Sequence, residues 1–260
     1  MHKILKNIGL EVTHVDIIEL NEEIIKAAKM YLGMEQLMNQ HHANGIAIRS
    51  LVPWVKGMID ITPCMANMEL NKQLKVGVCE GLVNSAITEM FCVYSFDCPN
   101  FIGDVVGIDR INDIVTFAHC QCPVNPHGTD RAPYTIRSHT LQKDNKMIPD
   151  DYPEAAQNPG AAVQVELPAD EITTTVKFSI YDKKIAVGRG MSVSGEKFYK
   201  NFEDILYRTK LVFTTDSESF EKNYGNVVFG VHRNFISGDY KERIKDLARL
   251  IGFGVIEEDK

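Results

Sequence analysis

The sequence predicts an α/β fold with a parallel sheet over residues 1–104, followed by a mostly antiparallel, β-barrel-like domain with a terminal helix over residues 105–260. In the first, Rossmann-like part, short apolar strands alternate with helical segments, and this order predicts βαβ units. In the second part, β-like runs follow one another without helices between them, which indicates an antiparallel sheet or barrel. We therefore expect a domain boundary near Val105.

The first part contains two helical patterns and several short strands. Residues 20–44 carry apolar side chains at helical spacing, and Pro53 stands near the start of a Met-rich helix that runs toward Lys72. The other elements expected in this part are strands at residues 10–15, 46–48, 76–78 and from 101 onward, and a helix at 84–95.

The second part is dominated by short runs with strand character. We expect strands at residues 105–108, 114–118, 173–180, 184–187, 210–214 and 227–231. A helix is expected at residues 240–251, ending at Gly252 as a C-cap would. Residues 122–168 are rich in Pro, Asn, Asp and Gly and predict a long loop, which in a compact protein is usually functional or mobile.

Composition and charge limit the possible partners. The net charge is -7 and no basic stripe is present, so we expect no nucleic-acid partner. No apolar run approaches the roughly 20 residues that span a bilayer, and the first residues are too polar for a signal peptide. These features predict a cytoplasmic protein that handles small molecules. Its six cysteines are then expected to be reduced, buried thiols.

Two carboxylates follow apolar runs in the first part of the chain. Glu80 comes directly after residues 76–79, and Asp104 ends the run that starts at Asn100. If both runs are strands of one open α/β sheet, both carboxylates lie at its carboxyl edge, where ligands bind. There they could hold a divalent metal or act as a general acid and base. Alternatively, Glu80 begins a helix and Asp104 belongs to a turn.

Two histidines could join these carboxylates. His232 is expected at the end of the strand at residues 227–231, and His119 at the end of the strand at 114–118. Two carboxylates with an imidazole form a hard ligand set that suits Mn²⁺, Mg²⁺ or Fe²⁺. A zinc site made of His119, Cys120 and Cys122 is disfavoured because only one residue separates the cysteines. Each histidine could also simply be buried and hydrogen-bonded.

Three further residues could face a ligand pocket. Arg137 and His139 alternate with Ser138, so in a strand they share one face, where they could bind hydroxyl groups or a carboxylate, or form a surface ion-pair face. Trp54 is the only tryptophan, and its ring could stack on a sugar or pack in the core.

Taken in order, these segments resemble the L-fucose isomerase / L-arabinose isomerase family. The resemblance extends from about Gly45 to the C-terminal end and depends on an ordered set of short segments rather than on one specific motif. These segments are Ile61 to Cys64, Cys79-Glu80, Phe101 to Asp104, Ile108-Asp109, His119-Cys120, Ile136 to His139, Tyr207 to Thr209, Val231-His232 and Gly238 to Tyr240.

The resemblance implies a metal-dependent aldose–ketose isomerase, usually with Mn²⁺ and alternatively with another divalent metal such as Mg²⁺. Glu80, Asp104 and His232 match the family's metal ligands, and His119 matches a further histidine of the arabinose branch. The metal would chelate adjacent sugar oxygens while one carboxylate moves a proton between C2 and C1 through a cis-enediol. Arg137 and His139 would line the pocket of the monosaccharide substrate.

The chain departs from the family in two respects. Family members form oligomers and carry an additional N-terminal α/β domain. The resemblance therefore implies a homo-oligomer, and it leaves open a separate partner that supplies that domain. Family chains also commonly have an acidic residue two positions after the metal glutamate, where this chain has Leu82. The alternative function is therefore a non-catalytic sugar-binding or assembly module that keeps the isomerase fold.

Overall fold

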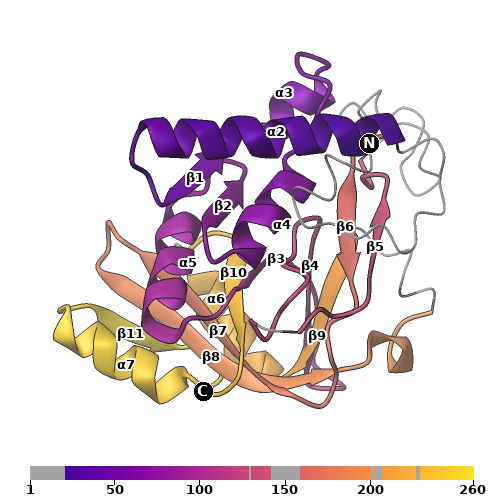
Figure 1. Ribbon diagram of the computed structural model, residues 1–260. Coiled ribbons are helices and arrows are strands. Elements are labelled where there is room, and N and C mark those ends of the chain that lie inside the picture. Colours follow the sequence, from indigo (N-terminus) through magenta and orange to yellow (C-terminus); the bar gives the residue numbers. More distant parts are fainter. Residues whose placement is uncertain (1–20, 129, 142–158, 201, 203–206, 227–228) are drawn as a thin grey trace.

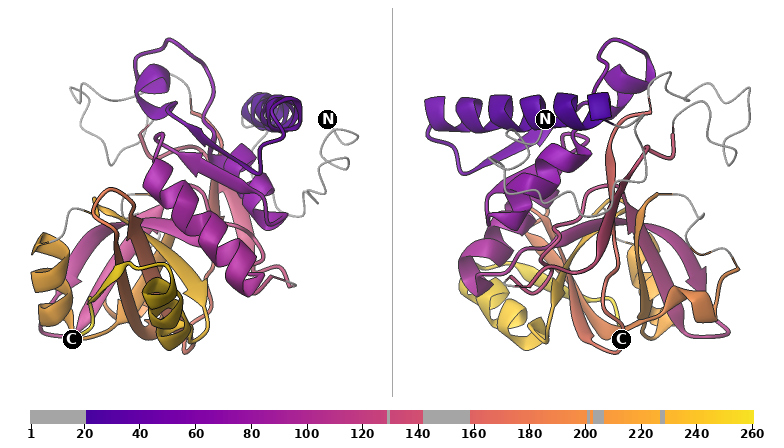
Figure 2. Two further views of the ribbon diagram at one scale, coloured as in Figure 1. Left: turned by 90° about the vertical axis from the view of Figure 1, so that its left-hand side faces the viewer. Right: turned by 45° about the vertical axis from the view of Figure 1, so that its right-hand side comes forward.

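The computed structural model describes residues 21–128, 130–141, 159–200, 202, 207–226 and 229–260. The described residues form helices, a mixed seven-stranded sheet and two two-stranded sheets, so the fold is broadly α/β. Figures 1 and 2 show the N-terminal helices and the small sheet β1–β2 on one side of the large sheet. The strand predicted at residues 10–15 lies outside the described residues.

The N-terminal part contains the parallel strand pair that the sequence predicts. Strand β1 (Gly45–Ile48) pairs in parallel with β2 (Val76–Cys79), with Gly45 opposite Val76. The long helix α2 (Asn21–Gln40) lies across this pair and α4 (Figure 1). Helix α5 (Val83–Phe96) follows β2, close to the predicted bounds.

The single Met-rich helix predicted from Pro53 to Lys72 is wrong. The structure has two helices in this stretch, α3 (Leu51–Val55) and α4 (Cys64–Lys72). Gly57 has a φ of 67°, which is incompatible with a continuing right-handed helix, and Pro63 then stands at the N-cap of α4. Gly57 and Pro63 are both visible in the sequence, but the Met-rich stretch that contains them favoured one continuous helix.

The large sheet has the strand order β11-β8-β7-β10-β3-β4-β9. Its strands are β3 (Phe101–Asp109), β4 (Ile114–His119), β7 (Ile172–Ser179), β8 (Lys184–Val193), β9 (Thr209–Thr214), β10 (His232–Ser237) and β11 (Gly254–Glu257). All neighbouring strands pair antiparallel except β11 and β8. Strand β8 also pairs with β9, but the sheet is mixed rather than a clear barrel, so the predicted architecture holds only in part.

Several elements of the second part differ from prediction. The expected loop at residues 122–168 contains the paired strands β5 (Tyr134–Arg137) and β6 (Ala162–Val165). Helix α6 (Ser217–Asn226) was not predicted, because its sequence is mostly polar. The helix expected at 240–251 is present as α7 (Lys241–Leu250), and Gly252 follows it with a φ of 72°.

The hydrophobic core is continuous across the boundary expected near Val105. It joins Met68 and Leu70 of α4 to Phe101, Phe117 and Phe235 of the large sheet. Helix α5 also contacts this sheet directly, since the Thr88 hydroxyl accepts a hydrogen bond of 3.0 Å from the backbone N–H of Phe178. In the described residues, no helix combines the length and the apolar character that crossing a membrane requires.

Candidate metal centre

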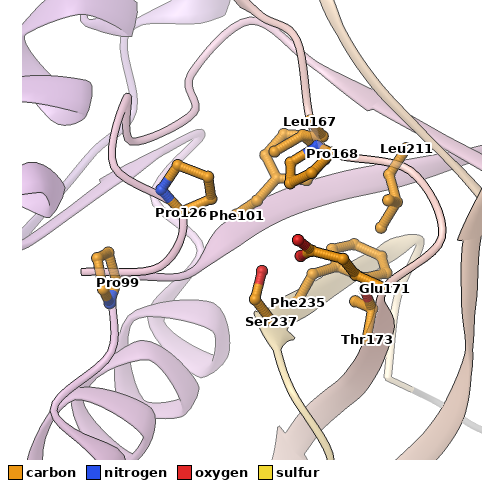
Figure 3. Close-up of a pocket in the computed structure, with 10 residues that line it drawn as sticks. All are labelled: Pro99, Phe101, Pro126, Leu167, Pro168, Glu171, Thr173, Leu211, Phe235 and Ser237. Atoms are coloured by element: carbon orange, nitrogen blue, oxygen red, sulfur yellow. The ribbon is translucent and has the colours of Figure 1, made fainter. Parts of the chain in front are cut away.

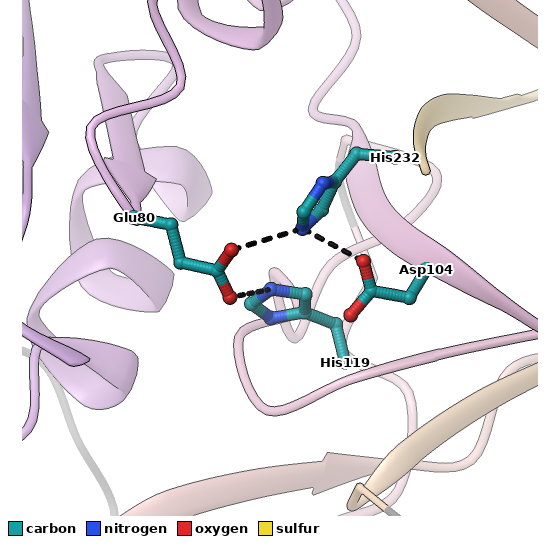
Figure 4. Close-up of side chains that lie close together, drawn as sticks. All are labelled: Glu80, Asp104, His119 and His232. Carbon is teal, nitrogen blue, oxygen red and sulfur yellow. Dashed lines mark ion pairs between the residues drawn. The ribbon is translucent and has the colours of Figure 1, made fainter. Parts of the chain in front are cut away.

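Glu80 is placed by a tight turn at the end of β2. Its φ of 62° lies in the left-handed region, and Gly81 follows with a φ of 68°. A non-glycine residue in this region is strained, and such strain often accompanies a functional position. The turn directs the Glu80 side chain toward the large sheet, where it is 25% exposed (Figure 4).

Asp104 and His232 lie opposite each other on the antiparallel strands β3 and β10. The expectation that each residue ends a strand is wrong: Asp104 lies within β3, and His232 begins β10. The apolar residues before His232 had suggested a strand at 227–231, but the chain turns at Gly230 with a φ of 72°. Because paired residues project to the same side of a sheet, Asp104 Oδ1 comes within 2.8 Å of His232 Nε2.

His119, the last residue of β4, completes the cluster. Its Nε2 atom lies 3.9 Å from Glu80 Oε1, and His232 Nε2 lies 3.5 Å from Glu80 Oε2. One ligand atom from each of Glu80, Asp104, His119 and His232 can be chosen so that all four lie within 4.8 Å of one another (Figure 4). The structure thus brings together the four residues expected to bind metal.

The polar atoms of this cluster fit a bound cation. Asp104 Oδ1, His119 Nδ1 and His232 Nε2 are buried and have no hydrogen-bond partner within the described residues. The short contact between Asp104 and His232 therefore lacks good hydrogen-bond geometry, although the two atoms are close. Buried polar atoms without partners are costly, and a metal ion shared by the cluster would satisfy Asp104 Oδ1 and His232 Nε2 together.

The protonation states also suit metal ligands. Burial lowers the pKa of His119, which keeps its imidazole neutral near pH 7 and able to bind a metal. Burial alone would raise the pKa of Asp104, but His232 and His119 outweigh it and lower the pKa, so Asp104 is ionised.

Tyr207 is a site residue to which the sequence assigned no role. Its ring stacks on His119 with 5.7 Å between centroids and 3° between planes, and its hydroxyl donates a hydrogen bond to Asp104. Burial, followed by the charge of Asp104, raises its pKa, so the phenol keeps the proton that it donates. Tyr207 belongs to one of the segments that carry the family resemblance, and that was the only sequence signal for it.

A narrow hollow adjoins the cluster. Its walls include Glu80, His119, Trp54 and His139, so two of the predicted substrate-binding residues lie beside the candidate metal ligands. Trp54 contacts His139 edge to face at 4.9 Å, and its indole N–H has no partner within the described residues.

Arg137 does not line this hollow. Strand β5 ends at Arg137, so the expected shared strand face with His139 is not formed. The guanidinium of Arg137 instead donates a hydrogen bond of 2.9 Å to the side-chain oxygen of Gln164 on β6. Arg137 thus joins β5 to β6.

A second hollow has none of the four candidate ligands in its lining, and Figure 3 shows the residues that line it. It is lined by Pro99, Phe101, Pro126, Leu167, Pro168, Glu171, Thr173, Leu211, Phe235 and Ser237. Glu171 is its single ionisable lining group, so this hollow lacks the paired acid, base or metal ligands of the other.

Comparisons with known protein families and curated proteins identified no relative of this chain. The chain matches no model of a known protein family, and no curated protein matches it significantly.

Proposed function

We propose that this chain is a divalent-metal-dependent aldose–ketose isomerase of the L-fucose / L-arabinose isomerase type, acting through a cis-enediol. The observation that carries the proposal is the convergence of ligand atoms from Glu80, Asp104, His119 and His232 within 4.8 Å. The order of these residues in the chain, which resembles that family, supplies the reaction class.

Mn²⁺ is the proposed ion, with Mg²⁺ as the alternative. The donor set contains two carboxylates and two imidazoles, and imidazole nitrogen is a better match for a transition metal than for Mg²⁺. When bound, the ion would polarise adjacent oxygens of an aldose.

The two carboxylates are proposed to have different roles. Asp104 is 11% exposed in its side chain and is held by Tyr207 and His232, which suits a fixed ligand. Glu80 is more exposed and lines the hollow that would receive the sugar. Glu80 is therefore proposed to take the proton from C2 and return it to C1, in addition to binding metal.

Trp54 and His139 are proposed to contact the monosaccharide, because both line the hollow next to Glu80. The protein is further proposed to be a cytoplasmic homo-oligomer, with a separate N-terminal-domain partner as an additional possibility. The presence of six free, buried thiols is consistent with a reducing compartment.

The test is a panel of aldoses assayed for ketose formation with added Mn²⁺. We expect a ketose from at least one aldose, and loss of turnover in Glu80→Gln. Glu242→Gln, at an exposed residue of α7, is the matched control and should retain activity. Ketose formation that is unchanged in Glu80→Gln removes Glu80 from the mechanism.

The alternative function predicts a different result from the same protein. A non-catalytic sugar-binding or assembly module forms no ketose, but a sugar that binds the hollow raises its melting temperature. Failure of every aldose in both assays contradicts both functions.

A further inference from the structure

Cys64 and Cys120 form a buried thiol pair beside the candidate metal centre. Cys64 begins α4, and Cys120 directly follows His119 at the end of β4. The two side chains are 2% and 1% exposed and pack together in one small cluster with Ala162. Their thiols are close enough to hydrogen-bond to each other.

The other cysteines are arranged differently. Cys92 and Cys98 lie in a separate hydrophobic cluster, and the Cys122 thiol lies 3.5 Å from the carbonyl oxygen of Pro123. Cys79 is the third thiol near the pair, but its side chain interacts with Ser50 rather than with either partner thiol by hydrogen bonding. Cys64 and Cys120 are thus the pair already in side-chain contact.

Cys64 belongs to the wall of the hollow beside Glu80 and His119, and Cys79 belongs to the same wall. Cys120 packs in one cluster with Cys64 and is not part of that wall. A small oxidant that reaches this hollow would come close to Cys64 before Cys120.

We propose that Cys64 and Cys120 are a redox modification site, at which hydrogen peroxide forms a reversible disulfide that disables the neighbouring metal centre. In the first step, the Cys64 sulfur takes one oxygen from peroxide, which gives a sulfenic acid and one water. The Cys120 sulfur then displaces the hydroxyl group from Cys64, forming the S–S bond and a second water. Overall, two thiols lose two protons and two electrons, and peroxide is reduced to water.

The disulfide acts on the centre through the backbone of β4. An S–S bond of about 2 Å is much shorter than a contact between two thiols, so its formation draws Cys120 and α4 together. Because His119 precedes Cys120, this movement changes the position of one candidate ligand. The predicted loss of metal affinity depends on the proposed metal site, whereas formation of the disulfide does not.

The test is titration of the full chain with hydrogen peroxide, followed by peptide mapping without reduction and by Mn²⁺ calorimetry. We expect a peptide pair joined through Cys64 and Cys120, reversed by dithiothreitol, and Mn²⁺ affinity reduced by about tenfold or more in the oxidised protein. Cys64→Ser and Cys120→Ser should each abolish the cross-link and keep Mn²⁺ affinity after peroxide treatment. Cys92→Ser, also at a buried cysteine, should behave like the unaltered chain.

The outcomes separate this inference from the proposed function. A cross-link through Cys79 overturns the inference, and so does the absence of a reversible cross-link. Peptide mapping of the unaltered chain gives this result, so it does not depend on the folding of a serine variant. A Cys64–Cys120 cross-link with unchanged Mn²⁺ affinity overturns the claim that it disables the centre. Absence of Mn²⁺ binding in the reduced protein instead contradicts the metal site itself.

Discussion

Asp104 Oδ1 and His232 Nε2 lie 2.8 Å apart across two paired strands, yet neither atom has a hydrogen-bond partner of good geometry within the described residues. Buried polar atoms without hydrogen-bond partners are costly, and a cation shared by these two residues would remove that cost. This relationship supports the proposed metal centre.

Asp104→Asn should weaken Mn²⁺ binding by at least about 100-fold, because it removes a charged ligand rather than an outer contact. The amide is nearly the same size, so the fold should be retained. Isothermal titration calorimetry measures the affinity, and Asp246→Asn, at an exposed residue of α7, serves as the control. Equal affinities of the two variants for Mn²⁺ would contradict the proposed ligand set.

Mn²⁺ should stabilise the folded chain. A ligand that binds only the native state at 100 times its dissociation constant adds about 2.7 kcal/mol to the free energy of unfolding. We therefore expect a higher melting temperature with Mn²⁺ and its reversal by a chelator. In His119→Gln combined with His232→Gln the metal should have little effect on the melting temperature, and a full effect there would place Mn²⁺ elsewhere.

Glu258→Ala should destabilise the protein by about 3–5 kcal/mol, because it leaves the Arg233 guanidinium buried without its counter-ion. Both side chains are fully buried, and two guanidinium nitrogens contact the carboxylate at 3.0 Å and 2.7 Å. Urea denaturation measures the loss in the free energy of unfolding. Glu242→Ala, which removes an exposed pair with Lys245, should cost less than about 1 kcal/mol.

The same substitution should also weaken Mn²⁺ binding. Arg233 donates a hydrogen bond of 3.0 Å to the backbone carbonyl of His232, so Glu258 helps to fix the strand that carries this ligand. A destabilised Glu258→Ala protein with unchanged Mn²⁺ affinity would show that the ion pair supports the fold alone.

Lys177→Met should flatten the pH dependence of stability between pH 7 and about pH 10. Burial, followed by the charge of Arg233, lowers the pKa of Lys177 to about 7 from its ordinary value of 10.5. Between these values the unfolded chain holds a proton that the folded chain has lost, so the free energy of unfolding of the unaltered protein rises with pH. Below pH 7 both states hold the proton and the full cost of burying the charge is present.

The size of this effect is on the order of a few kcal/mol, given that one pKa unit corresponds to about 1.4 kcal/mol. Urea denaturation at several pH values measures it, and Lys184→Met, at an exposed residue of β8, is the control. Parallel pH profiles for the unaltered chain and Lys177→Met would show that Lys177 stays protonated when buried.

The sequence was most informative where local signals agreed with tertiary structure. The strand ending at Cys79, the helix after it and the C-cap at Gly252 all lie close to their predicted places, because apolar pattern and glycine chemistry act locally. Glu80 was therefore predicted in its correct position at a strand end.

Asp104 and His232 show what local pattern could not provide. Asp104 was assigned to a parallel sheet, but β3 pairs antiparallel with its neighbour β4 and with β10, which lies far away in the sequence. The sequence also predicted two short strands where the structure has one, β3, which contains a bulge between Val105 and Gly107. The four candidate ligands were selected by residue type and order, whereas the place of Tyr207 and the contact of Arg137 with Gln164 required the tertiary structure.

The pairing of β3 with β10 has a kinetic consequence. These strands are separated by most of the large sheet's sequence, so the chain must close a long loop before Asp104 meets His232. Contacts between distant segments generally slow folding. If the proposed centre binds a metal ion, it can do so only after β3 and β10 have paired. The rate of metal binding during refolding would then report the rate at which these two strands pair.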